Sequence, residues 1–146
     1  MDKAVKNPGP DHPITIERNP DRIIVTFARQ IIADTKDGLI LKEADYPPVH
    51  YVPLKDVNVP LLKRTDHTTH CPYKGDCSYY TIVVGKGGEN AVWQYDKPHE
   101  AVAAIKDHVA FYPDRVEITN QPPVGRPALG RTSAIGGRWT GAARED

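Results

Sequence analysis

The sequence has no apolar stretch long enough to span a membrane and no excess of charge of either sign. None of its apolar runs approaches the roughly 18 residues that a membrane-spanning helix needs. The first residues, Met1-Asp2-Lys3-Ala4, lack the apolar core of a signal peptide. Nineteen basic and nineteen acidic residues give a net charge of zero, which argues against a nucleic-acid binder that relies on a broad basic field. We therefore expect a soluble cytoplasmic protein that neither inserts into a membrane nor binds nucleic acid.

Cysteine is also scarce, which excludes a disulfide framework. The two cysteines, Cys71 and Cys77, lie six residues apart, and a cytoplasmic location would keep them reduced. With His67 and His70 they would supply four metal ligands, but their spacing matches no common zinc motif, and no second cysteine pair follows. We expect two free thiols, no bound metal and no cofactor.

The common phosphate-binding motifs are missing as well. Neither G-x-x-x-x-G-K-[ST] nor G-x-G-x-x-G occurs in the chain. The glycine-rich stretch Gly85-Lys86-Gly87-Gly88 lies between two β-prone runs and has no helix N-terminus to offer a phosphate. This stretch predicts a hairpin loop.

Most of the positive signal is for short strands separated by turns. The chain contains 14 prolines and 11 glycines, which disfavours long helices. The pair Asp37-Gly38 is typical of a hairpin turn. Residues rich in β-branched, aromatic and other apolar side chains predict about eight strands, which include 14–16, 22–27, 30–34, 39–43, 49–52, 79–84, 91–95 and 115–118.

One segment has a helical pattern. Ala101, Val102 and Ile105 share a face at helical spacing, and Pro98 suits a first-turn position. The sequence therefore predicts a mainly β domain over residues 13–119 with one short α-helix of about three turns within 99–107. Residues 1–12 are expected to form a flexible leader, and the Pro-, Gly- and Arg-rich residues 120–146 a poorly ordered tail.

Polar and aromatic residues that suit a binding site gather between residues 65 and 95. A loop that runs from Thr69 to Lys74 leads directly into the strand of Tyr79 and Tyr80. The strand of Trp93 and Tyr95 would pair back beside it, which brings these side chains together around a cleft. Tyr79 and Tyr80 point to opposite faces of one strand, so one belongs to the core and the other to a surface or pocket. Asp45 and Tyr46, ahead of a Pro-Pro bend, are placed where they would close over such a pocket.

Three functions are compatible with this segment. The leading hypothesis is a domain that binds an unidentified small molecule through Thr69, Lys74, Tyr79, Tyr80, Trp93 and Tyr95. The second is an enzyme that uses Cys71 as a nucleophile or redox thiol, with Lys74 and a nearby histidine lowering the pKa of that thiol. We favour Cys71 as a small buried apolar side chain. The third is a protein-interaction module with an exposed sheet edge.

Several blocks of sequence resemble the signature of domain-of-unknown-function family 427. They are His70-Cys71-Pro72-Tyr73-Lys74-Gly75, Ser78-Tyr79-Tyr80 and Ala91-Val92-Trp93-Gln94-Tyr95-Asp96-Lys97-Pro98. The resemblance covers residues 21–119 and implies a small, mostly β protein with the twisted-sheet architecture called a β-tent. Cys71 matches the family pattern, whereas Cys77 stands where the family usually has a small residue without a thiol.

The family is also catalogued under a nucleotidyltransferase label, which the residues themselves do not support. Enzymes of that kind hold two metal ions with a paired Asp-x-Asp behind a Gly-Ser turn. The chain has no such turn, and Asp34 and Asp37 are three residues apart across a predicted hairpin.

Overall fold

The computed structural model describes residues 5–122 of the chain, in which ten strands form two antiparallel sheets. A seven-stranded sheet has the order β1-β4-β5-β9-β8-β7-β6, and a three-stranded sheet has the order β10-β2-β3. The strands are β1 (Ile14–Asn19), β2 (Arg22–Phe27), β3 (Gln30–Thr35), β4 (Gly38–Glu43), β5 (Val49–Pro53), β6 (Leu62–Cys71), β7 (Gly75–Ile82), β8 (Val92–Tyr95), β9 (His108–Phe111) and β10 (Glu117–Gln121). The mainly β class predicted from the sequence is confirmed.

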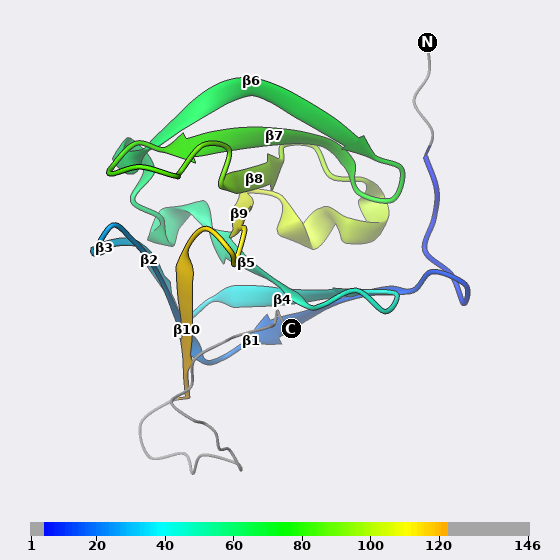
Figure 1. The fold of residues 1–146 in the computed structure, drawn as a ribbon. Coiled ribbons are helices and arrows are strands. Elements are labelled where there is room, and N and C mark those ends of the chain that lie inside the picture. Colours follow the sequence, from blue (N-terminus) through cyan, green and yellow to red (C-terminus); the bar gives the residue numbers. More distant parts are fainter. Residues whose placement is uncertain (1–4, 123–146) are drawn as a thin grey trace.

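The larger sheet is strongly bent. In Figure 1, β6, β7 and β8 lie above β1 and β4, and β5 and β9 connect the two halves at the bend. The three-stranded sheet stands against one side of this bend, and an isolated bridge between Ala33 and Val57 links β3 to the segment after β5. Both sheets remain open, in keeping with the β-tent architecture that the family resemblance implies. The bend places side chains from β4 and β5 opposite side chains from β7 and β8.

Residues 69–71, which were expected to belong to the loop 69–74, are part of the long strand β6. Thr68 pairs with Ser78 and Cys71 with Gly75, and the register shifts between Arg64 and Thr68. This stretch contains no proline or glycine before Pro72, and its threonines are β-branched residues that suit a strand. The true turn is therefore the short connection 72–74, which fixes Lys74 at the end of a hairpin.

The predicted helical segment is present, but it winds as a 3-10 helix. Element η3 (Glu100–Ile105) is six residues long, and Val102 within it has non-helical angles, with φ −125° and ψ 26°. Val102 and Ile105 are both fully buried, and their spacing of three is the period of a 3-10 helix. The predicted buried face is thus correct for Val102 and Ile105 but not for Ala101, which is exposed. The α-helical type and the length of three turns are not confirmed either, because η3 is a 3-10 helix of six residues. The other helical elements of residues 5–122 are η1 (Leu54–Asp56) and η2 (Val59–Leu61), which are also 3-10.

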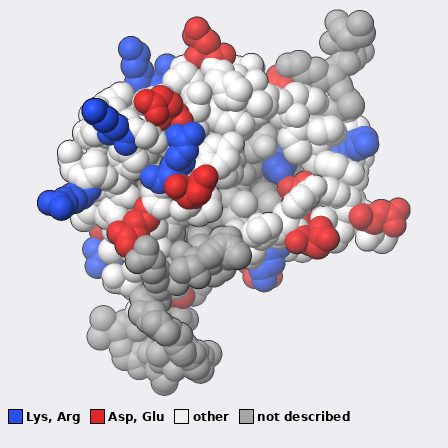
Figure 2. All heavy atoms as spheres, viewed as in Figure 1, with Lys and Arg blue, Asp and Glu red and all other residues white. Residues whose placement is uncertain are grey.

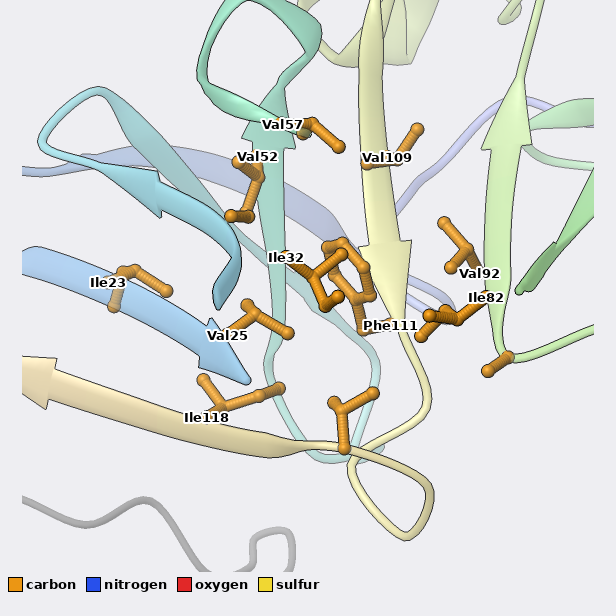
Figure 3. Packing of buried hydrophobic residues seen from close by; sticks show 13 residues of the cluster. Ile23, Val25, Ile32, Val52, Val57, Ile82, Val92, Val109, Phe111 and Ile118 are labelled. Carbon is orange, nitrogen blue, oxygen red and sulfur yellow. The ribbon is translucent and has the colours of Figure 1, made fainter. Parts of the chain in front are cut away.

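Two clusters of buried apolar residues hold the fold together. The first fills the space between the three-stranded sheet and strands β5, β8 and β9, as Figure 3 shows for side chains such as Ile23, Ile32 and Val109. The second lies inside the bend of the larger sheet and is rich in tyrosine. Tyr79 belongs to the second cluster and Tyr80 packs against the first, as expected for neighbours on one strand.

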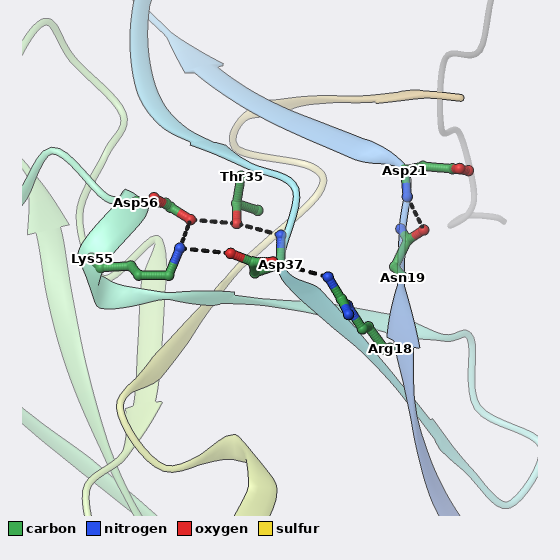
Figure 4. A network of polar contacts seen from close by, with 7 residues as sticks. All are labelled: Arg18, Asn19, Asp21, Thr35, Asp37, Lys55 and Asp56. Carbon is green, nitrogen blue, oxygen red and sulfur yellow. Dashed lines mark hydrogen bonds and ion pairs between the residues drawn. The ribbon is translucent and has the colours of Figure 1, made fainter. Parts of the chain in front are cut away.

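A surface network ties the hairpin between β3 and β4 to η1. The Asp37 backbone N–H and the Asp56 carboxylate are both hydrogen-bonded to the Thr35 hydroxyl, at 2.9 and 2.7 Å (Figure 4). Lys55 Nζ lies 2.7 Å from Asp37 Oδ2 and 2.8 Å from Asp56 Oδ2, and its hydrogen bond holds the pKa of Asp37 below the usual value. Arg18 adds a contact to Asp37 at 3.2 Å. Asp37 is therefore engaged in surface ion pairs.

The first described residues contact the domain, and the last ones form a strand. The Lys6 N–H donates to the Pro72 carbonyl at 2.8 Å, and the His12 ring stacks on Tyr73 with centroids 3.9 Å apart. At the other end, β10 continues to Gln121. Most of the predicted tail lies outside the described residues. That residues 1–12 can be removed without unfolding the domain stays a prediction.

Gly88 is expected to tolerate no side chain. A Cβ at this position would lie 2.5 Å from the Ile82 carbonyl oxygen and 3.0 Å from Ile82 Cβ, so Gly88→Ala should lower the free energy of unfolding by about 1–3 kcal/mol. Gly9→Ala is the matched control, because a Cβ there meets nothing within 4 Å. Urea denaturation of both variants measures the difference. Equal stabilities would contradict the close approach of Gly88 to β7.

Candidate functional site

A cavity of about 520 Å³ opens inside the bend of the larger sheet. Its lining comes from both halves of that sheet and from the segment that follows β9. Most of the lining side chains are aromatic or apolar, and Glu43 and Lys74 supply the ionised groups. The remaining lining residues are Leu41, Tyr46, Pro47, Pro48, Val49, His50, Tyr51, Tyr79, Trp93, Tyr95, Phe111, Tyr112, Pro113 and Ile118.

Strands β7 and β8 provide an aromatic wall. Tyr79 lies directly opposite Trp93 in the antiparallel ladder, and Tyr95 follows on the same face of β8 because side chains alternate along a strand. Trp93 Nε1 donates a hydrogen bond to the Tyr51 hydroxyl on β5 at 3.1 Å. The Trp93 ring also lies against Tyr112, with centroids 4.5 Å apart. These contacts fix the orientation of the indole ring at the centre of the wall.

Glu43 and Lys74 form an ion pair in the lining of the cavity. Glu43 is the last residue of β4, and its Oε1 accepts a short hydrogen bond from Lys74 Nζ. The other carboxylate oxygen, Oε2, lies 2.7 Å from His12 Nε2. Only 13% of the Glu43 side chain and 11% of the Lys74 side chain are exposed. Burial acts to raise the Glu43 pKa, but the hydrogen bonds from Lys74 and His12 outweigh it, so the pKa lies below its ordinary value.

The turn that carries Lys74 is fixed by its backbone. The Lys74 carbonyl accepts a hydrogen bond from the His99 N–H at 3.0 Å, and the Lys74 N–H donates to the Cys71 carbonyl at 3.2 Å. Gly75 follows with a φ of +116°, and a Cβ there would lie 3.2 Å from the Lys97 carbonyl. A glycine is needed at this position because the backbone is left-handed and closely approached. The local sequence Lys74-Gly75 thus sets the place of the ammonium group.

Burial keeps four further titratable groups of the cavity uncharged at neutral pH, namely Tyr51, Tyr79, Tyr95 and His50. Burial raises the pKa values of Tyr51, Tyr79 and Tyr95 above the ordinary tyrosine value. Burial also lowers the pKa of His50 to about 4, and the nearby charge of Asp21 opposes this only in part. The cavity therefore contains neutral phenols, a neutral imidazole and one internally balanced ion pair.

Four of the seven residues proposed from the sequence line this cavity, namely Lys74, Tyr79, Trp93 and Tyr95. Thr69 stands behind the wall, where its hydroxyl is hydrogen-bonded to the Tyr79 hydroxyl at 3.0 Å. Tyr80 lies on the other face of β7 and donates to Gln94 Oε1 at 2.8 Å. Cys71 is half-buried, packs against the second core cluster and does not contribute to the lining.

Sequence reasoning missed the residues that β4, β5 and β9 bring to the cavity. Glu43 is the last residue of a strand beside a turn, which is a position typical of a solvated carboxylate. No local pattern therefore indicates that Glu43 belongs to a binding site. Tyr51 and Phe111 are aromatic residues in β-prone runs, and no local pattern indicates that they line a site. Tyr46, which was expected to close over a pocket, is in the lining and is 61% exposed, whereas Asp45 is not among the lining residues.

Both cysteines are free thiols, and burial raises the pKa of the Cys77 thiol. Within residues 5–122, no group of three or more His, Cys, Asp or Glu side chains is arranged to hold a metal ion.

No helix in this part of the chain is long and apolar enough to cross a membrane. The cytoplasmic location expected from the sequence stays a prediction.

The chain belongs to the family described as "Domain of unknown function (DUF427)", whose model matches residues 15–122 and also carries the label NTP_transf_9. This confirms the resemblance seen in the sequence. A search of curated proteins found no match. The two aspartates considered for a metal-dependent transferase are both engaged elsewhere: Asp34 pairs with Arg22 at 2.6 Å, and Asp37 belongs to the network of Figure 4. Neither lines the cavity.

The Glu43 ion pair predicts a specific loss of stability in acid. The pKa of Glu43 is lower in the folded state than in the unfolded state, where it is about 4.5. Ionised Glu43 therefore stabilises the fold fully at pH values above the unfolded-state pKa. This contribution is lost as the pH falls through the lower folded-state pKa. The free energy of unfolding of the wild type should therefore exceed that of Glu43→Gln by about 1–3 kcal/mol near neutral pH. This difference should shrink in acid. Urea denaturation at several pH values measures it. Glu17→Gln is the control, since Glu17 lies 3.9 Å from Lys42 and is 62% exposed. A difference for Glu43→Gln that does not change with pH would contradict the assignment.

Proposed function

We propose that this protein binds a small molecule in the cavity between β4–β5 and β7–β8. The observation that carries the proposal is a concave aromatic surface with a largely buried ion pair at one end. Its volume of about 520 Å³ lies within the range of about 300–1,000 Å³ that is typical of ligand sites. Such sites combine apolar walls with a few well-placed polar groups, and Glu43, Lys74 and the tyrosine hydroxyls supply these groups.

The lining favours binding over catalysis by the Cys71 thiol. A nucleophile must reach the bound substrate, and Cys71 is packed against the second core cluster outside the cavity lining.

The alternative of an interaction module rests on β6, an edge strand of the seven-stranded sheet with mostly exposed residues. Basic and acidic side chains are interspersed over the face shown in Figure 2, so no charged surface of one sign indicates a partner there. The net charge of zero of the sequence supports the prediction that nucleic acid is not a partner.

The proposal is tested by titrating the full chain with 2-naphthol, a neutral bicyclic probe, and following the indole N–H signal of Trp93 by NMR. That signal is assigned by its loss in Trp93→Phe. We expect a saturable shift of the signal, because a ring bound against the wall changes the magnetic environment of the indole. No shift at saturating probe would contradict the proposed function.

Two neighbouring tyrosines provide matched variants for this titration. Tyr79→Leu removes a ring of the wall and should weaken binding about tenfold, the equivalent of about 1.4 kcal/mol. Tyr80→Leu removes an equal ring from the opposite face of β7 and should leave the affinity unchanged, because Tyr80 is not in the lining. Equal losses of affinity in both variants would place the probe elsewhere.

A further inference from the structure

We propose that the ligand of this cavity is an electrically neutral, planar ring system that carries a ring N–H next to a carbonyl, as in a cyclic amide. The carbonyl accepts a hydrogen bond from Lys74, the N–H donates to Glu43, and the ring lies against the aromatic wall of Tyr79, Trp93 and Tyr95. This inference rests on the proposed function and specifies the chemical class of the ligand.

The charge balance of the site selects against ions. Glu43 and Lys74 are in direct contact, and His12 adds a second hydrogen bond to Glu43. A carboxylate ligand would find the ammonium already neutralised and would face the repulsion of Glu43. A cationic ligand would find the Glu43 carboxylate already neutralised and would face the repulsion of Lys74. Because a charged group loses hydration on entering such a site and gains no net opposite charge, a neutral ligand is favoured.

The same pair offers one donor and one acceptor side by side. In the described contacts, Lys74 gives one of its three protons to Glu43, so its ammonium retains donor capacity toward a ligand. Each carboxylate oxygen of Glu43 accepts one described hydrogen bond and has a further lone pair. An adjacent N–H and carbonyl on one ring edge match this donor–acceptor pair. Hydrogen bonds to charged groups are among the stronger ones in proteins, which makes the pair the main source of specificity.

The rest of the lining favours a flat ring over a flexible chain. Tyr79 and Trp93 form a cross-strand pair, and the hydrogen bond from Trp93 to Tyr51 holds the indole in place. Rigid aromatic faces bind planar rings by offset or edge-to-face contacts. The ammonium of Lys74 also lies 5.8 Å from the centre of the Tyr95 ring, so the polar end adjoins the wall. A ligand ring against the wall can therefore reach the ion pair with its own edge.

Three quinoline probes of matched size test this proposal on the full chain. Quinolin-2(1H)-one has the adjacent N–H and carbonyl, 2-methoxyquinoline has the same rings without them, and quinoline-2-carboxylate is anionic. Binding is followed through the Trp93 indole N–H signal. We expect quinolin-2(1H)-one to bind about tenfold or more tightly than either of the others. Equal affinity for all three probes would overturn the inference and leave the proposed function standing, whereas no binding by these probes or by 2-naphthol would overturn both.

Glu43→Gln should change this preference in a defined direction. The variant removes the negative charge and leaves the ammonium of Lys74 unbalanced, so quinoline-2-carboxylate should gain about tenfold in affinity and quinolin-2(1H)-one should not. Lys74→Met, which keeps an unbranched side chain but removes the ammonium group, should remove the advantage of quinolin-2(1H)-one over 2-methoxyquinoline. It provides a second test if Glu43→Gln does not fold. Unchanged probe preference in either folded variant would contradict a role of the ion pair in recognition.

Discussion

Trp93→Ala is expected to weaken the binding of 2-naphthol by at least about tenfold and to lower the free energy of unfolding by about 3 kcal/mol. The indole forms the centre of the wall, packs against Tyr112 and donates to the Tyr51 hydroxyl. Deletion of the ring removes all of these contacts and leaves the hydroxyl of Tyr51, a residue only 1% exposed, without its donor. Urea denaturation gives the stability, and saturation-transfer NMR observed on the probe gives the affinity without needing the tryptophan signal.

Trp93→Phe is the control for this prediction. It keeps an aromatic ring in the wall and removes only the larger indole and its N–H, so both losses should be clearly smaller than in Trp93→Ala. If Trp93→Ala lost stability but bound the probe as wild type does, Trp93 would be a core residue without a part in binding.

Phe111→Ala is expected to cost about 3–5 kcal/mol in the free energy of unfolding. Phe111 is only 3% exposed and belongs to the first core cluster (Figure 3). Its side chain also lines the cavity. Loss of the ring would leave a void next to the cavity, which cannot close because β5, β8 and β9 are held in one sheet. Urea denaturation measures the effect. Val83→Ala is the control, since Val83 is 50% exposed, and it should change stability by less than about 0.5 kcal/mol.

Phe111→Ala should also enlarge the cavity toward the first core cluster. A tricyclic analogue of the probe, 2-anthrol, should then gain affinity relative to 2-naphthol. If the variant were as stable as wild type, the ring would not pack as described. If the relative affinity of the two probes were unchanged, the void would not connect with the cavity.

The part of the site that the sequence could predict is the part made by neighbouring segments. Strands β7 and β8 follow one another in the sequence and are joined by the glycine-containing connection 83–91, so their pairing follows from local signals. Alternation along each strand places Trp93 and Tyr95 on one face. Alternation along β7 also places Tyr79 and Tyr80 on opposite faces of the strand. Family membership was also available from the sequence, because the matching blocks cluster around Cys71, Tyr79 and Trp93.

The other half of the site depends on long-range packing. Glu43 meets Lys74 only because the seven-stranded sheet bends and brings the end of β4 to the turn after β6. No local pattern indicates that bend. The sequence could not predict that η3 is a 3-10 helix, because the spacing of Val102 and Ile105 fits both an α-helix and a 3-10 helix. Packing of the two side chains in the second cluster decides between these types. Residues 69–71 have a composition that suits a strand, and their pairing with β7 places them in β6.

The most direct measurement of the central claim is a set of intermolecular nuclear Overhauser effects between 2-naphthol and the full chain. We expect contacts from the probe protons to the rings of Trp93 and Tyr95, which line the cavity. Contacts only to exposed apolar side chains outside it, such as Ile31, Val59 and Val83, would contradict the claim, as would the absence of any contact at saturating probe.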